Sequence, residues 1–322
     1  MTRAPLLVLV GALALGAAAC GTGSTAVSER AGAALTAPTV APSSSTTTTT
    51  DPGQHCVTPE SPPALSPVPS QAEASSDPFM KSVFDRKEKN LVVAVDENTP
   101  GLSARNPETS DLEGLEVTVA QRIAQRIYGG APGEHVRFET VTTKEKIDLP
   151  KLGKVDLSIS AISITCERWK DVAFSTEYLR ARQAYLVRNE SPIKTKEDLA
   201  GARVCVTTGS TSVGILDDWN TGYLEPQGKQ PAKPVLVDTR NDCLLELQEG
   251  TVDAYLGHDT FINAMLLQDP GLRALPEGTV SHYGIAMNND EDHNYFVRYV
   301  NGVLDELRAD GTLPTLEPEP VR

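Results

Sequence analysis

Short apolar runs alternate with amphipathic stretches from residue 91 onward, and this alternation constrains the fold more than any other feature. LVVAV (91–95) predicts a buried strand, and residues 115–128 place Val119, Ile123 and Ile127 at helical spacing. Further strands are expected at 135–141, 155–162, 182–187, 203–209, 234–238, 252–257 and 283–288, and further helices at 212–220, 243–250, 260–268 and 294–311. Such alternation is typical of an α/β protein with largely parallel sheets.

The charge balance excludes one class of partner. The chain holds 29 Lys and Arg against 43 Asp and Glu, a formal net charge of −14. Nucleic acid is therefore not expected as a partner, because phosphate neutralisation needs a basic face. After the N-terminus, the sequence has no apolar run long enough to span a bilayer.

The first 20 residues have the pattern of an export signal. Arg3 supplies a positive start, and residues 5–19 form an apolar stretch that ends in small residues before Cys20. Residues 17–20 (AAAC) resemble the bacterial lipobox, so we expect a signal peptide over 1–19. Cys20 would carry lipid, such as palmitate, and anchor the chain to the outer face of the cell membrane. Cleavage at an ordinary A-x-A site, leaving a free secreted protein, is the alternative.

Residues 20–76 are rich in proline, serine and threonine, including a threonine run at 46–50. Apolar periodicity is absent from this stretch. It cannot bury enough surface to offset its ordering entropy, so we expect a disordered tether.

The remaining cysteines, Cys56, Cys166, Cys205 and Cys243, fit an oxidising compartment. Four cysteines allow three pairings. We expect Cys205–Cys243, because the two residues fall in one lobe of the architecture given below, and hence Cys56–Cys166. A metal site is the alternative, but the sequence contains neither CxxC nor clustered histidines.

No catalytic signature is present: GxSxG, P-loop, HExxH and GxGxxG are all missing. The five histidines are scattered along the chain. We therefore expect no enzyme, no cofactor and no metal. An enzyme on this scaffold would need an acid or base in the cleft, for which His258 and Glu97 are the candidates.

Three separate features could together hold a free amino acid. Arg168 follows a strand pattern and suits a carboxylate. The turn at 208–212 joins a strand to a helix, where backbone N–H groups bind anions. Asp259 begins a helix and could accept from an ammonium group. The alternatives are a surface ion pair for Arg168 and a plain helix cap for Asp259.

The string ISAISITCERWKDVAFSTEYL (159–179) resembles the signature of bacterial extracellular solute-binding proteins of the polar amino acid class. The match continues through LEGLEVTVAQRIA (112–124), EDLAGARVCVTTGSTSVG (197–214) and GTVDAYLGHDT (250–260). The resemblance covers roughly residues 85–313 and is strongest to actinobacterial glutamate/glutamine-binding lipoproteins.

That resemblance implies roles for individual residues. Arg168 would bind the ligand α-carboxylate and Asp259 its α-ammonium group. Assisting residues would be Ser163, Ala161, Thr211 and Ser212, with side-chain selection by residues 96–105, including Asn98 and Arg105. Apart from the resemblance, Arg105, Arg182 and Arg240 are candidates to meet a side-chain carboxylate, and the alternative for each is an exposed surface arginine.

The sequence departs from the family pattern in two places near the site. Glu116 and Thr118 replace two aspartates of the family, and Leu102 stands where an aromatic residue often lies.

The resemblance also implies the architecture and the partners. We expect a two-lobed periplasmic-binding-protein (type II) α/β fold, with lobe 1 at 77–184 plus 284–322 and lobe 2 at 189–280. A two-segment hinge would lie at 185–188 and 281–283. A monomer would bind glutamate, aspartate, glutamine or asparagine and deliver it to the permease of an ABC importer. A membrane-tethered amino acid sensor that feeds a signalling partner is the alternative.

Overall fold

The computed structural model describes residues 59–313. The expected signal peptide, Cys20, Cys56 and the tether up to residue 58 lie outside these residues. Within 59–313, no helix has the length and apolar character needed to cross a bilayer.

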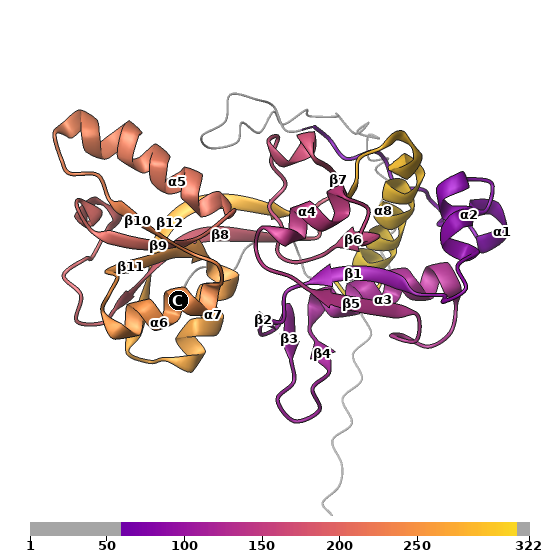
Figure 1. Cartoon of the computed structure of the whole chain (residues 1–322), viewed down its shortest axis with the longest axis horizontal. Helices are drawn as coiled ribbons and strands as arrows, with labels where there is room; N and C mark the ends of the chain where they lie inside the picture. The colour runs from indigo at the N-terminus through magenta and orange to yellow at the C-terminus, as the bar shows by residue number, and fades with distance from the viewer. Residues whose placement is uncertain (1–58, 314–322) are drawn as a thin grey trace, which may run out of the picture. The chain divides into compact units, whose positions relative to one another are not determined.

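The first sheet has five short strands in the order β5-β1-β6-β13-β7 (Figure 1). Its strands are β1 (Leu91–Val95), β5 (Val136–Thr140), β6 (Leu157–Ser158), β7 (Val172–Phe174) and β13 (Ala286–Asn288). β1 pairs in parallel with β5 and β6, whereas β13 runs antiparallel to β6 and β7. The strand expected over 155–162 is much shorter, because only Leu157 and Ser158 pair before the chain reaches a left-handed residue at Ala161 (φ 47°).

Helices α3 (Leu115–Tyr128) and α8 (Asn294–Ala309) bury their apolar stripes in the core of this first lobe. The stripe of α3 includes the predicted Val119, Ile123 and Ile127. Three helices that the sequence did not predict complete the lobe: α1 (Gln71–Ala74), α2 (Pro78–Phe84) and α4 (Glu145–Lys151). Each is seven residues long or shorter, so its periodicity is too brief to read.

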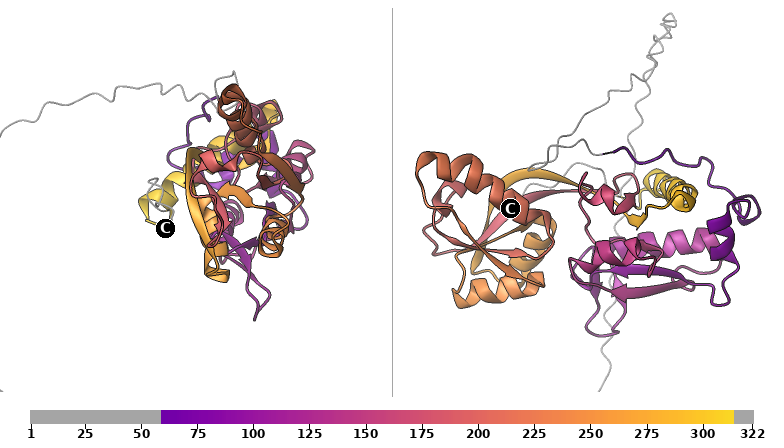
Figure 2. Two further views of the ribbon diagram at one scale, coloured as in Figure 1. Left: turned by 90° about the vertical axis from the view of Figure 1, so that its left-hand side faces the viewer. Right: turned by 45° about the horizontal axis from the view of Figure 1, so that its top comes forward.

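The second sheet has the order β10-β9-β11-β8-β12. Its strands are β8 (Leu179–Arg188), β9 (Arg203–Thr207), β10 (Lys233–Val237), β11 (Ala254–His258) and β12 (Leu272–Tyr283). Side chains alternate along β9, so Val204 and Val206 pack with α5 (Thr211–Trp219). Cys205 packs on the opposite face with α6 (Arg240–Glu249) and α7 (Asp259–Gln268). Figure 2 shows helices on both sides of this sheet.

The predicted Cys205–Cys243 disulfide is present and joins β9 to α6, with the Cα atoms 5.6 Å apart. The pairing of Cys166 with Cys56 stays a prediction, because Cys56 lies outside the described residues.

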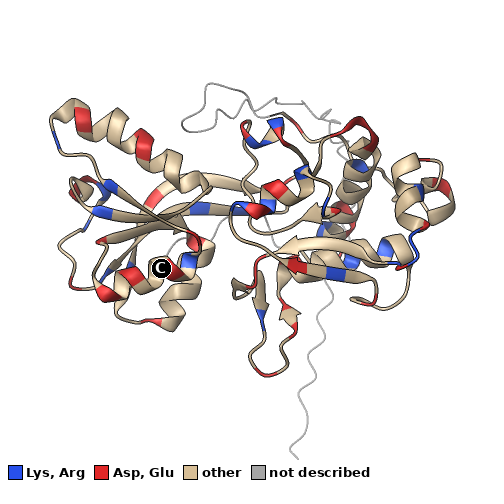
Figure 3. Ribbon diagram, in the orientation of Figure 1, with Lys and Arg blue, Asp and Glu red and all other residues tan. Residues whose placement is uncertain are grey.

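Smaller elements connect these layers. A three-stranded sheet follows β1 and consists of β2 (Asn98–Thr99), β3 (Ser103–Arg105) and β4 (Leu112–Glu113). Short 3₁₀ and π turns are η1 (Arg168–Lys170), η2 (Lys196–Leu199), η3 (Asn220–Leu224), η4 (Glu225–Gln227) and η5 (Glu291–His293). Acidic and basic residues are distributed over the elements of both lobes (Figure 3).

Two long antiparallel strands, β8 and β12, connect the lobes. They pair from Leu179↔Tyr283 to Arg188↔Leu272, with a register shift between Pro276 and Val280. The hinge segment expected at 185–188 is misplaced, because Tyr185 and Leu186 already pair with β11 inside the second sheet. Residues 179–182 pair with β12 alone, so the crossing segments are 179–182 and 280–283.

The tether expected up to residue 76 is wrong at its C-terminal end. Residues 59–70, which we call the N-terminal strap, lie along α8, and Val68 is buried in the core. The hydrogen bonds that hold the strap include Leu65 N to Arg298 O (3.0 Å), Asn301 Nδ2 to Pro62 O (2.6 Å) and Ser61 Oγ to Phe174 O (2.8 Å). The strap therefore belongs to the folded lobe.

Gly302 of α8 allows the strap to approach, because a Cβ at this position would lie 2.4 Å from the Leu65 carbonyl oxygen. We expect Gly302→Ala to displace the strap and to lower the free energy of unfolding by about 1–3 kcal/mol, measured by urea denaturation. Gly214→Ala in α5 is the matched control, since nothing lies within 4 Å of a Cβ there and alanine favours a helix. Equal stability of the two variants would contradict the contact.

Candidate functional site

Five of the predicted ligand residues line one small cavity. Ala161, Ser163 and Arg168 come from the first lobe, and Thr211 and Ser212 come from the start of α5 in the second. This inner cavity has a volume of about 20 Å³, and it adjoins a wider cavity of about 590 Å³ that also touches Ser163, Arg168 and Thr211. A volume of 20 Å³ holds about one water molecule, so a ligand requires these walls to separate.

Arg168 bridges the two walls of the cavity. Its Nη1 donates to the Ser163 carbonyl oxygen at 2.9 Å, and its Nη2 donates to the Gly209 carbonyl oxygen at 3.2 Å. Gly209 belongs to the turn before α5, which begins at Thr211 without a side-chain cap. A guanidinium beside the positive end of a helix is a suitable place for a carboxylate.

A buried carboxylate fixes the loop that carries Ala161 and Ser163. Glu116 accepts from the Ala161 backbone N–H at 2.7 Å, from the Ser103 hydroxyl at 3.0 Å and from the Tyr178 hydroxyl. Burial raises the pKa of Glu116, and these three hydrogen bonds act against that rise. Glu116 thus holds Ala161 in its left-handed conformation beside the cavity.

His258 lies at the base of the cavity in its neutral form. Ser212 Oγ donates to Gln183 Oε1 (3.1 Å), which directs the Gln183 amide nitrogen toward His258 Nε2 at 2.9 Å. His258 Nε2 is therefore an acceptor, and Ser281 Oγ lies 2.8 Å from it. Burial, reinforced by the charges of Lys146, Arg168 and Arg240, moves the pKa of His258 well below its usual value of 6.5.

Two further cations line the same inner cavity. Lys146 donates to the Ser160 carbonyl oxygen at 3.3 Å, and burial together with the charge of Arg168 lowers the pKa of Lys146 to about 7. Arg240, at the start of α6, is buried as well. The cavity therefore combines three basic side chains with a neutral histidine.

Comparison with known proteins identifies the relatives of this chain. Residues 91–318 match the family described as bacterial extracellular solute-binding proteins, family 3. The chain belongs to this family. The ABC transporter glutamine-binding protein of Bacillus subtilis (strain 168) is 27% identical over 246 residues, which cover 75% of this chain and 85% of the relative. A glutamine-binding protein of Geobacillus stearothermophilus is 30% identical over 212 residues, covering 65% and 76%.

A solved structure has the same architecture. An ancestral arginine-binding protein bound to glutamine matches with a TM-score of 0.60 and 29% identity, covering 69% of this chain and 93% of that one. The fold is therefore the two-lobed type II fold that the sequence predicts.

Three predicted site residues do not line the inner cavity of this family member. Asn98 borders a separate cavity of about 210 Å³. Arg105 is half exposed and pairs with Glu97 at 2.8 Å, and it lines none of the three cavities around the site. This pair also occupies Glu97, one of the two residues considered as a catalytic acid or base.

Asp259, the third residue, is buried at the start of α7, directly after His258 of the inner-cavity lining. Its Oδ1 accepts from the backbone N–H groups of Arg182 (3.1 Å) and Thr260 (2.9 Å). Both bonds go to Oδ1. Burial raises the pKa of Asp259, and the two backbone hydrogen bonds and the charge of Arg182 act against that rise. Its role toward an ammonium group stays a prediction.

Sequence reasoning missed Glu116, Gln183 and Lys146 as members of the site. Glu116 had a usable signal, because it lies three residues before Val119 and so falls on the buried stripe of α3. Lys146 had none, since α4 is short and carries charges on both sides of it. Among residues 59–313 no group of His, Cys, Asp or Glu is arranged to hold a metal ion.

The state of His258 predicts how stability depends on pH. The folded-state pKa lies below the unfolded value, so the unfolded chain takes up a proton first and stability falls as the pH drops below 6.5. We expect the slope to approach about 1.4 kcal/mol per pH unit below pH 6.5, and His258→Gln to reduce it. Urea denaturation across this range measures the slope. At about pH 8, His258 is neutral in both the folded and the unfolded chain. The wild type and His258→Gln compared at that pH are therefore the control. An unchanged slope in His258→Gln would contradict the assignment.

Proposed function

We propose that this chain is an extracytoplasmic receptor that binds a free polar amino acid between its lobes and delivers it to an ABC importer permease. The observation that carries the proposal is the cavity where Arg168, Ser163 and the start of α5 meet. Family membership supports the same function, since the most similar relatives include glutamine-binding proteins.

The ligand would be held at both of its poles. Arg168 and the first turn of α5 would take the α-carboxylate, because a guanidinium and a helix N-terminus both favour an anion. Asp259 would take the α-ammonium group through Oδ2. The ligand would then contact both lobes, and that shared contact is what favours their closure. Glutamate, aspartate, glutamine and asparagine are the candidate ligands.

Arg168→Ala tests the carboxylate subsite. We expect it to weaken binding of the preferred amino acid by at least about a hundredfold, since a charged hydrogen-bond partner of the carboxylate is lost. Calorimetric titration of the full chain measures this effect, after a thermal-shift screen of the standard amino acids identifies the ligand. Asp259→Asn should also weaken binding, whereas Arg122→Ala removes a half-exposed arginine that pairs with Asp310 and should not. Binding that survives both site substitutions would refute the proposed clamp.

We also propose that Cys20 anchors the receptor to the outer face of the cell membrane. Cys20→Ala is expected to move the protein from the membrane fraction to the medium and to abolish labelling by radioactive palmitate. Ser24→Ala is the control and should remain in the membrane fraction. Retention of the Cys20→Ala protein on the membrane would instead indicate anchoring by other means.

A further inference from the structure

The Arg240 guanidinium is surrounded by groups that suit a cation. It pairs with the Asp96 carboxylate and donates from Nη2 to Thr99 Oγ1 at 2.8 Å. Its Cζ lies 3.9 Å from the centroid of the Phe261 ring, which is cation–π contact. The side chains of Arg240 and Asp96 are each only 10% exposed, so both charges are largely removed from water.

The pair joins the two lobes at the candidate site. Asp96 directly follows β1 of the first sheet, whereas Arg240 begins α6 on the second. Arg240 also lines both the inner cavity and the separate 210 Å³ cavity, which Asp96 borders too. The side chain of Arg240 therefore lies where an incoming ligand would extend.

The charges on the two sides of Arg240 differ. The separate cavity is bordered by the carboxylates of Asp96, Glu97, Glu145 and Asp238. The inner cavity has no acidic side chain in its lining among the described residues, and its basic groups are Lys146, Arg168 and Arg240. The lining of the inner cavity thus presents basic groups and no acidic group, which suits an anionic ligand side chain better than a cationic one.

We propose that Arg240 is the residue that decides the charge of the ligand side chain. It fills the cation subsite made by Asp96, Thr99 and Phe261, which excludes arginine, lysine and histidine as ligands. It also leaves the inner cavity positive, which favours the anionic side chains of glutamate and aspartate over their amides. This inference rests on the proposed function and narrows its four candidate ligands to two.

Calorimetric titration of the full chain with L-glutamate, L-glutamine and L-arginine tests this assignment. The wild-type protein is expected to bind glutamate at least about tenfold more tightly than either competitor. In Arg240→Ala, Asp96 loses its partner, so glutamate should weaken and arginine should strengthen, each by at least about tenfold. The double variant Asp96→Asn/Arg240→Ala should show no gain for arginine, because the freed carboxylate is gone.

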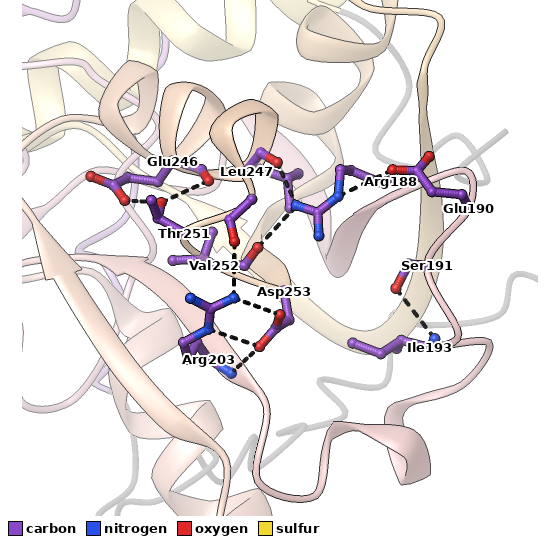
Figure 4. Close-up of polar contacts among 11 residues, drawn as sticks. Arg188, Glu190, Ser191, Ile193, Arg203, Glu246, Leu247, Thr251, Val252 and Asp253 are labelled. Carbon is purple, nitrogen blue, oxygen red and sulfur yellow. Dashed lines mark hydrogen bonds and ion pairs between the residues drawn. The ribbon is translucent and has the colours of Figure 1, made fainter.

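Arg203→Gln is the matched control for loss of an arginine–aspartate pair in the second lobe. Arg203 pairs with Asp253 at 2.9 Å near the surface (Figure 4). It lines none of the three cavities around the site, so its loss should leave the glutamate-to-arginine ratio unchanged. Arg240→Lys retains the positive charge and should still exclude arginine. It serves as the second variant if Arg240→Ala does not fold.

Two results would overturn the role of Arg240 and leave the proposed function intact. The first is that the wild-type protein binds arginine or glutamine as tightly as glutamate. The second is that the ratio of glutamate affinity to arginine affinity is unchanged in Arg240→Ala. The second result would show that the pair with Asp96 only connects the lobes. Failure of the wild-type protein to bind any standard amino acid would overturn the proposed function together with this inference.

Discussion

The site depends on one buried carboxylate. Glu116 is enclosed at the start of α3, and the hydrogen bonds from Ala161, Ser103 and Tyr178 compensate for the loss of water around its charge. A positive φ costs free energy in a non-glycine residue such as Ala161, and the hydrogen bond to Glu116 offsets that cost. The direction of the chain through Ser163 to Arg168 follows from that bend, and so does the position of the guanidinium.

Local pattern was enough to predict most of the fold. The boundaries of α3 match the prediction because its apolar stripe and the terminal Gly129 agree. The strand β12 escaped prediction because Pro276 and Gly278 lie inside it, at the register shift, and both residues normally signal a turn. The N-terminal strap escaped for a different reason: its proline-rich composition suggests disorder, while its order comes from contacts with α8 that no local pattern encodes.

Site residues that lie in one sequence motif could be predicted, whereas those that only tertiary packing brings together could not. Arg168, Ser163 and Ala161 lie in one continuous string, and the structure places all three on one cavity with Thr211 and Ser212. Lys146 and Arg240 reach that cavity from α4 and α6, whose positions depend on tertiary packing. Arg105, although close to β1 in sequence, turns outward to Glu97 because β3 runs along the three-stranded sheet.

The two bridging arginines contribute differently to binding, and the acceptors they use explain why. Arg168 now donates to the neutral carbonyl of Gly209, so exchanging that partner for a ligand carboxylate replaces a weaker bond with a charge-assisted one. Arg240 already pairs with a carboxylate, so exchanging Asp96 for a ligand carboxylate gains little. A ligand favours closure only through its excess affinity for the closed state. On the proposed function, Arg168 therefore supplies affinity for the α-carboxylate that all amino acids share, whereas Arg240 determines which side chains are accepted.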